Sequence, residues 1–195
     1  MAAPSVPVVA TPDPFADIAE PDNDLWHFAL SFYGRQDVSS ACLVLQNELG
    51  VDVDILLFAI FAGVERGVAL DMQELAAIDG LVRGWRSEIV QVLRQIRKRL
   101  KPAPFSSSAT EGLRNRIKAD EIKAEQIELA MLVDWLERQP PRRADPPVDA
   151  QSIPLLVARY FVGKTEALHA PDVDDALRKL MQAIGAGNAG RSSGT

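Results

Sequence analysis

The residues best suited to chemistry are two carboxylates that precede a strongly apolar segment. Asp52 and Asp54 stand immediately before the run ILLFAIFA. Carboxylates at the start of a helix commonly accept hydrogen bonds from free backbone N–H groups, and they meet the positive end of the helix dipole. If they instead share a cleft with Glu48, they could bind a cation or act in acid–base catalysis. Because no oxygen-rich loop with metal-ligand spacing accompanies them, we predict capping, no metal site and no cofactor.

Aromatic and polar residues before these carboxylates suggest a pocket. Cys42 lies on an apolar helix stripe, where a cysteine usually acts as a small, inert hydrophobe. Gln46 follows one turn later and could present its amide to a cleft. The ligand-binding candidates are Trp26, Tyr33, Cys42, Gln46, Asp52, Asp54 and Asp120. No catalytic residue can be assigned, so the sequence does not decide whether the chain is an enzyme.

Asp120 stands inside the apolar stripe of a long helix predicted at about residues 109–138. A buried carboxylate without a partner would be costly. We therefore expect an ion pair that fixes the register of two helices, with a role in ligand binding as the alternative. The candidate partners are Arg83, Arg86 and Arg94.

A run of basic residues is the strongest local charge feature. It comprises Arg94, Arg97, Lys98, Arg99, Lys101, Arg114, Arg116 and Lys118. The formal net charge of −6, and the absence of a nucleic-acid motif or interleaved aromatic residues, argue against nucleic acid as the partner. A solvated helix face, or cover by the acidic N-terminal segment, explains the run equally well. We expect a protein partner, and the sequence does not decide the oligomeric state.

The elements that position these residues are predicted to be helices. Only 6% of residues are aromatic while 47% are hydrophobic, with many Ala and Leu, a balance that favours helix. Apolar residues recur at helical spacing through most of the chain. The predicted fold is all-α: a compact helical bundle in which two long helices form an antiparallel hairpin, plus a linked C-terminal helical pair.

Composition shifts divide the chain into five parts. Proline without apolar periodicity marks the N-terminal segment, and four prolines in QPPRRADPPVD mark a linker. The predicted boundaries are a disordered tail at 1–23, a helical domain at 24–138, a Pro-rich linker at 139–149, a helical pair at 150–186 and a disordered tail at 187–195.

The compartment is predicted from the cysteine and from the N-terminus. A single cysteine cannot form an internal disulfide, which suits a reducing compartment. The first 24 residues contain no Lys or Arg and are interrupted by proline, unlike a signal peptide. The longest apolar stretch has about ten residues, roughly half of a membrane span. We therefore predict a cytoplasmic protein without membrane insertion.

Three segments carry a resemblance to a known family. They are LWHFAL at 25–30 with Tyr33 after it, VSSACLVLQ at 38–46, and GVDVDILLF at 50–58. With these residues, the region from about 24 to 137 resembles the bacterial conserved hypothetical proteins that contain a domain of unknown function. The resemblance implies an all-helical fold and supplies no activity.

Two functional hypotheses follow from the sequence. Charged patches, terminal tails and a linked helical pair suit a non-enzymatic protein-interaction or assembly module, which is the preferred interpretation. The alternative is a small-molecule-binding protein or enzyme that uses a carboxylate and aromatic cleft.

Overall fold

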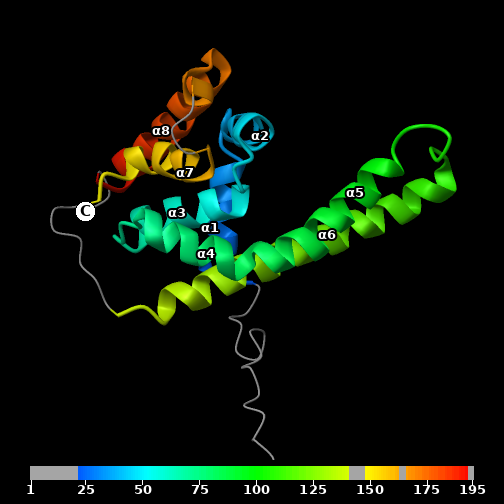
Figure 1. The fold of residues 1–195 in the computed structure, drawn as a ribbon, viewed down its shortest axis with the longest axis horizontal. Coiled ribbons are helices and arrows are strands. Elements are labelled where there is room, and N and C mark those ends of the chain that lie inside the picture. The colour runs from blue at the N-terminus through cyan, green and yellow to red at the C-terminus, as the bar shows by residue number, and fades with distance from the viewer. Residues whose placement is uncertain (1–21, 141–147, 163–165, 193–195) are drawn as a thin grey trace, which may run out of the picture.

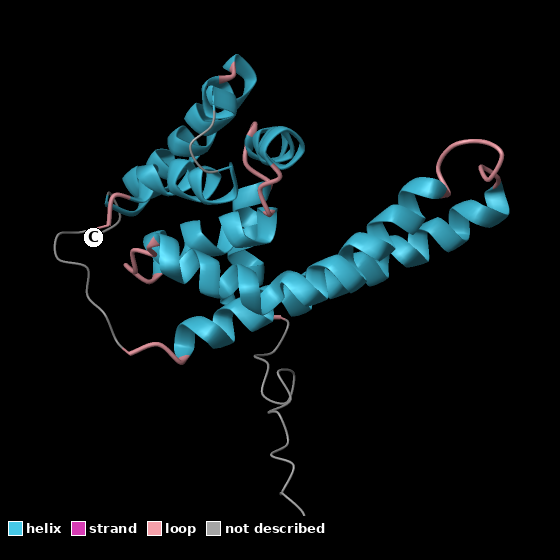
Figure 2. Ribbon diagram, in the orientation of Figure 1, coloured by secondary structure: helices cyan, strands magenta, loops and turns pink. Residues whose placement is uncertain are grey.

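The computed structural model describes residues 22–140, 148–162 and 166–192. All regular secondary structure in these ranges is helical, and no strand occurs among them (Figure 2). The prediction of an all-α fold is therefore confirmed. Within the same ranges, none of the helices combines the length and the apolar character needed to cross a membrane.

Three helices build the first part of the core: α1 (Asp24–Tyr33), α2 (Val38–Leu49) and α3 (Val53–Glu65). Helix α2 ends at Gly50, whose φ of 68° is a left-handed conformation that glycine adopts without steric penalty. This turn leads directly to the N-terminus of α3. From Ile55 through Gly63 every residue of α3 is buried, so this is the central helix, as its all-round apolar sequence predicts.

The predicted pair of long helices forms the antiparallel hairpin visible in Figure 1. The first limb consists of α4 (Met72–Trp85), a π-helical turn (Arg86–Val90) and α5 (Gln91–Arg99). The second limb is α6 (Ser108–Glu137). Two glycines in α4 suggest a kink, and the irregularity lies immediately after them, in the π-helical turn.

The outer part of the hairpin extends away from the other helices (Figure 1). We call residues 89–123 the arm. Helix α5 has no fully buried residue, whereas the second half of α6 passes through the core. The bundle is therefore compact around α3, and the arm projects from it.

The C-terminal helices α7 (Ile153–Val162) and α8 (Pro171–Ser192) complete the core. Helix α8 packs along α2, and α7 packs against α3 and α4 (Figure 1). The contact between α3 and α7 is close, because a Cβ atom at Gly63 would lie 2.3 Å from Ile153 Cδ1. The pair is therefore part of the bundle.

Helix α8 runs to Ser192, so it extends beyond the predicted end of the helical pair at residue 186 and into the predicted tail at 187–195. Most of the predicted tail at 1–23 and most of the predicted linker at 139–149 lie outside the described residues.

Candidate functional site

Three carboxylates from two elements meet beside the N-terminus of α3. Asp52 and Asp54 flank the start of that helix, and Glu128 comes from α6. One oxygen from each of the three lies within 4.8 Å of the others. Oδ1 of Asp52 accepts a hydrogen bond from the backbone N of Ile55 at 2.9 Å, which confirms that this residue is a helix cap. We call Asp52, Asp54 and Glu128 the carboxylate cluster.

Glu128 is the unusual member of the carboxylate cluster. Its side chain is fully buried, at 0% exposure. Neither of its carboxylate oxygens has a hydrogen-bond partner among the described residues. Burial of an unsatisfied carboxylate is costly, so the fold holds a group here that its own side chains do not satisfy.

Two arginines from the first limb of the hairpin border the carboxylate cluster. Arg86 donates through Nη1 to Asp52 Oδ2 at 2.9 Å and through Nη2 to Asp79 Oδ1 at 2.6 Å. Arg94 donates from Nε to Glu121 Oε1 at 2.9 Å and also pairs with Glu125. Both guanidinium groups are committed to carboxylates other than Glu128.

The electrostatics favour neutralisation of the carboxylate cluster. Burial, together with the charge of Asp52, raises the pKa of Glu128 to about 9, although Arg86 acts in the opposite direction. Burial and the charges of Glu128 and Asp52 raise the pKa of Asp54 well above its usual range. Negative charge thus exceeds positive charge at this position, and either protons or a cation can correct the imbalance.

Tyr33 is half-buried on α1, and Asp54 is one of the charges that act on its hydroxyl. Burial raises the pKa of its hydroxyl, and the charges of Cys42, Glu125 and Asp54 add to the effect. Cys42 itself is fully buried, and burial raises the pKa of its thiol to about 12. A thiol in this state is a poor nucleophile, as its place on the apolar stripe predicts.

The structure does not assemble the whole predicted pocket. Trp26 packs against the hydrophobic core from α1, and Gln46 is half-buried on α2; neither contributes an atom to the carboxylate cluster. Glu48, the predicted companion of Asp52 and Asp54, is exposed on α2. Glu128 takes the place that Glu48 was expected to fill.

The prediction that Asp120 is buried is wrong by one residue. Asp120 is exposed, whereas the adjacent Glu121 is only 4% exposed. Arg94 and Arg97 both pair with Glu121. The apolar stripe of α6 marks the face of the helix that enters the core. The face that contacts α5 is rotated from that stripe. The ion pair that fixes the helix register therefore uses Glu121 instead of Asp120.

Sequence reasoning missed Glu121, Glu125 and Glu128, and it offered Arg86 as a partner of Asp120 rather than of Asp52 and Asp79. A signal was present, because the three glutamates recur at intervals of four and three residues and so share one face of a helix. Glu128 also stands between Ile127 and Leu129 in an otherwise apolar stretch. A charged residue among buried neighbours requires an explanation that an exposed one does not.

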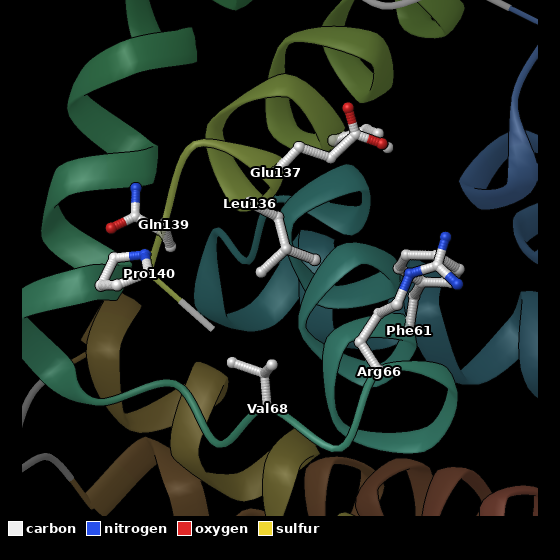
Figure 3. Close-up of a pocket in the computed structure, with 8 residues that line it drawn as sticks. Phe61, Arg66, Val68, Leu136, Glu137, Gln139 and Pro140 are labelled. Atoms are coloured by element: carbon white, nitrogen blue, oxygen red, sulfur yellow. The ribbon is translucent and has the colours of Figure 1, made fainter. Parts of the chain in front are cut away.

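A hollow of about 240 Å³ lies at the opposite end of α3 (Figure 3). Its walls are mostly apolar, with one arginine and one glutamate on them. The lining residues are Phe61, Arg66, Val68, Val133, Leu136, Glu137, Gln139 and Pro140. None of the predicted ligand-binding residues lines this hollow, and its walls lack a group of converging carboxylates.

The predicted basic run is divided between paired and exposed residues of the arm. Arg94, Arg97 and Arg114 form ion pairs with glutamates of α6. The exposed members are Lys98, Arg99, Lys101, Arg116 and Lys118. The outer end of the arm is therefore positively charged on a chain of net negative charge.

Apolar side chains are also exposed on the arm. Ile89, Val92, Ile96 and Leu113 are between 38% and 47% exposed. We call these four residues the apolar face of the arm. Large side chains of this kind seldom gather on a free surface without a binding role.

Comparison with known proteins gives a family and no activity. A model of a family described as a protein of unknown function (DUF2390) matches residues 24–132, which is more than half of the chain. The match begins at α1 and ends within α6. No curated protein and no solved structure matches this chain.

Proposed function

Because the chain belongs to the DUF2390 family of proteins of unknown function, we propose a function from its own surface: it is a protein-interaction module that binds a partner protein through the arm. The observation that carries the proposal is the apolar face, exposed on a hairpin that projects from the bundle. The arm contributes no residue to the hollow at the end of α3 and no member of the carboxylate cluster. Its exposed groups suit binding rather than catalysis.

The apolar residues of the two helices lie on the same side of the arm. In the first limb, Ile89 precedes the buried Val90 by one residue. In α6, Leu113 precedes the half-buried Arg114 by one residue. A shift of one residue corresponds to about a quarter turn of helix. Because the two limbs are antiparallel, a residue that precedes the inward-facing residue by one position lies on the same side of the arm in both limbs. Ile89, Val92 and Ile96 therefore form one exposed stripe along the first limb, and Leu113 of α6 lies on the same side of the arm.

The charge around the apolar face indicates the chemistry of the partner. Residues 94–118 contain eight Lys or Arg and a single acidic residue, Glu111. A partner that presents apolar side chains within an acidic rim would complement both features. An amphipathic acidic helix is the simplest such ligand, because its apolar stripe could pack on the apolar face of the arm. The partner proposed here is a protein with such a segment.

Site-specific photo-crosslinking in cells tests the proposal directly. A photoreactive residue placed at Val92 of the full-length chain should give a discrete crosslinked product with another protein. The same residue at Ile122 is the matched control, because Ile122 is also exposed but lies nine residues from Leu113, which is about half a turn away around α6. The control should give no such product.

Charge reversal supplies the second arm of this experiment. Replacing Lys98 and Arg99 with Glu should abolish the product from position 92 and leave the circular dichroism spectrum unchanged, because both side chains are exposed. A product of twice the mass of the chain would identify a second copy as the protein partner. No product from position 92, or equal products from positions 92 and 122, would contradict the proposal.

A further inference from the structure

We infer that Asp52, Asp54 and Glu128 form a binding site for one hard divalent cation of the Mg²⁺, Mn²⁺ or Ca²⁺ class. The site is independent of the proposed partner-binding role of the arm, since the carboxylate cluster lies where α3 and α6 meet in the bundle. The inference rests on the positions of three carboxylate oxygens and on Glu128, whose carboxylate has no hydrogen-bond partner among the described residues.

The spacing of the oxygens fits a single ion. Oxygen ligands lie about 2.0–2.6 Å from these cations, so two ligands on opposite sides of an ion are roughly 4–5 Å apart. The three carboxylate oxygens of the cluster lie within 4.8 Å of one another. One ion placed among them can therefore contact all three without a large movement of either helix.

Glu128 supplies the observation that an acidic cluster alone would lack. Its carboxylate is completely buried beside Asp52 and Asp54, and both of its oxygens lack a hydrogen-bond partner among the described residues. Such groups are rare in folded proteins unless water, an ion or a ligand satisfies them. The neighbouring arginines do not, because Arg86 binds Asp52 and Asp79, and Arg94 binds Glu121 and Glu125.

The donor set selects the class of ion. All three groups are carboxylates, which prefer hard cations over the softer ions that favour imidazole and thiolate. Asp52 and Asp54 are the two members of the carboxylate cluster that are not fully buried. Asp52 is held through both oxygens, Oδ1 by the backbone N of Ile55 and Oδ2 by Arg86, and these hydrogen bonds fix the orientation of its carboxylate.

Titration of the chelator-treated, full-length protein with Mn²⁺ tests the site. Isothermal calorimetry should show one ion per chain, and added Mg²⁺ or Ca²⁺ should compete for it. The Glu128→Gln variant keeps the size of the side chain but removes its charge, so it should weaken binding at least tenfold. Glu48→Gln removes an exposed carboxylate of the same type and should bind Mn²⁺ like the wild type.

Thermal unfolding provides a readout that does not depend on heat of binding. Saturating Mn²⁺ should raise the melting temperature of the wild type and of Glu48→Gln, because an ion that binds only the folded chain stabilises it. At the same Mn²⁺ concentration, the rise should be clearly smaller for Glu128→Gln and for Asp54→Asn, and the second variant decides the test if the first fails to fold. No binding at millimolar Mn²⁺, or binding that Glu128→Gln leaves intact, would overturn the inference and leave protons as the neutralising species.

Discussion

Asp79 joins three separate parts of the chain through a single carboxylate. It is 4% exposed, and it accepts hydrogen bonds from Arg83 and Arg86 of the hairpin and from the hydroxyl of Tyr160 in α7, the last at 2.9 Å. Arg86 in turn holds Asp52 of the carboxylate cluster. Asp79 therefore links the C-terminal helices to the carboxylate cluster through three hydrogen bonds, which join Tyr160 to Asp79, Asp79 to Arg86 and Arg86 to Asp52.

Replacement of Asp79 by Asn should destabilise the folded chain by about 2 kcal/mol at pH 7, because hydrogen bonds to a charged group contribute roughly 1.5–3 kcal/mol. Burial raises the pKa of Asp79, but the hydrogen bonds from Arg86, Arg83 and Tyr160 outweigh it and hold the pKa below the ordinary value of 3.8. The stabilisation is therefore present above that value and is lost as the pH falls through the folded-state pKa.

Urea unfolding at pH 7 and at pH 3 checks both parts of this prediction. The difference between wild type and Asp79→Asn should be smaller at pH 3, where protonation begins to remove the charge from the wild type as well. Tyr160→Phe is a milder control, since it removes one of the three donors and keeps the carboxylate. A difference that grows toward low pH would contradict the assigned direction of the pKa shift.

At the scale of the elements, the hairpin owes its register to charged side chains. Nε of Arg94 lies 2.9 Å from Oε1 of Glu121, and Arg97 pairs with the same carboxylate. Trp85 adds a hydrogen bond from its indole Nε1 to the backbone oxygen of Ala124 at 2.9 Å. The inner contact of the arm is thus partly polar, which leaves apolar residues available for the outer face.

Glu121→Gln should lower the free energy of unfolding by about 2 kcal/mol, since Arg97 loses its charged partner and Arg94 keeps only Glu125. Asp120→Asn is a matched control one residue away, because Asp120 is exposed and a surface substitution usually changes stability by less than about 0.5 kcal/mol. Urea midpoints of the two variants decide the matter. Equal effects would mean that the hairpin does not depend on the Glu121 pairs.

Asp120 and Glu121 also show how much of this fold the sequence predicts. Helical periodicity identifies the long helices and the central α3, because a buried face recurs along the whole length of each. Helical periodicity does not determine which residue at the edge of an apolar stripe is buried. Asp120 and Glu121 are adjacent acidic residues at such an edge, and only Glu121 is buried. Asp52 is identified correctly because a helix cap is a local feature.

Glu128 could not be assigned to the carboxylate cluster by local reasoning. It lies more than seventy residues from Asp52 and Asp54 in the chain. Its proximity depends on the angle at which α6 crosses α3, and a single sequence does not specify that angle. The π-helical turn that starts at Arg86 is equally hidden, because its sequence is ordinary for an α-helix.

At the scale of the whole molecule, the C-terminal helices and the rest of the bundle share one core. Leu180 of α8 and Leu45 of α2 are both fully buried in the same hydrophobic cluster. The guanidinium of Arg35 also donates to the backbone oxygen of Ala183 at 2.8 Å. These contacts indicate that the described helices unfold together.

Leu180→Ala and Leu45→Ala should each lower the free energy of unfolding by about 2–5 kcal/mol, the usual range for a large core residue truncated to Ala. Each variant should keep a single cooperative transition, and circular dichroism and tryptophan fluorescence should report the same urea midpoint. The exposed Leu43→Ala on α2 is the control and should have little effect. A separate early transition in Leu180→Ala alone would show that the C-terminal pair unfolds as its own unit.

The packing of α8 along α2 has a consequence during protein synthesis. Helix α2 leaves the ribosome more than a hundred residues before α8 is translated, so one of its apolar sides has no cover in the interval. At typical translation rates this interval is on the order of ten seconds. The hairpin of α5 and α6 has mainly local contacts and can form within that time. The nascent chain should therefore carry a preformed hairpin beside an exposed apolar surface, the kind of surface that ribosome-associated chaperones bind.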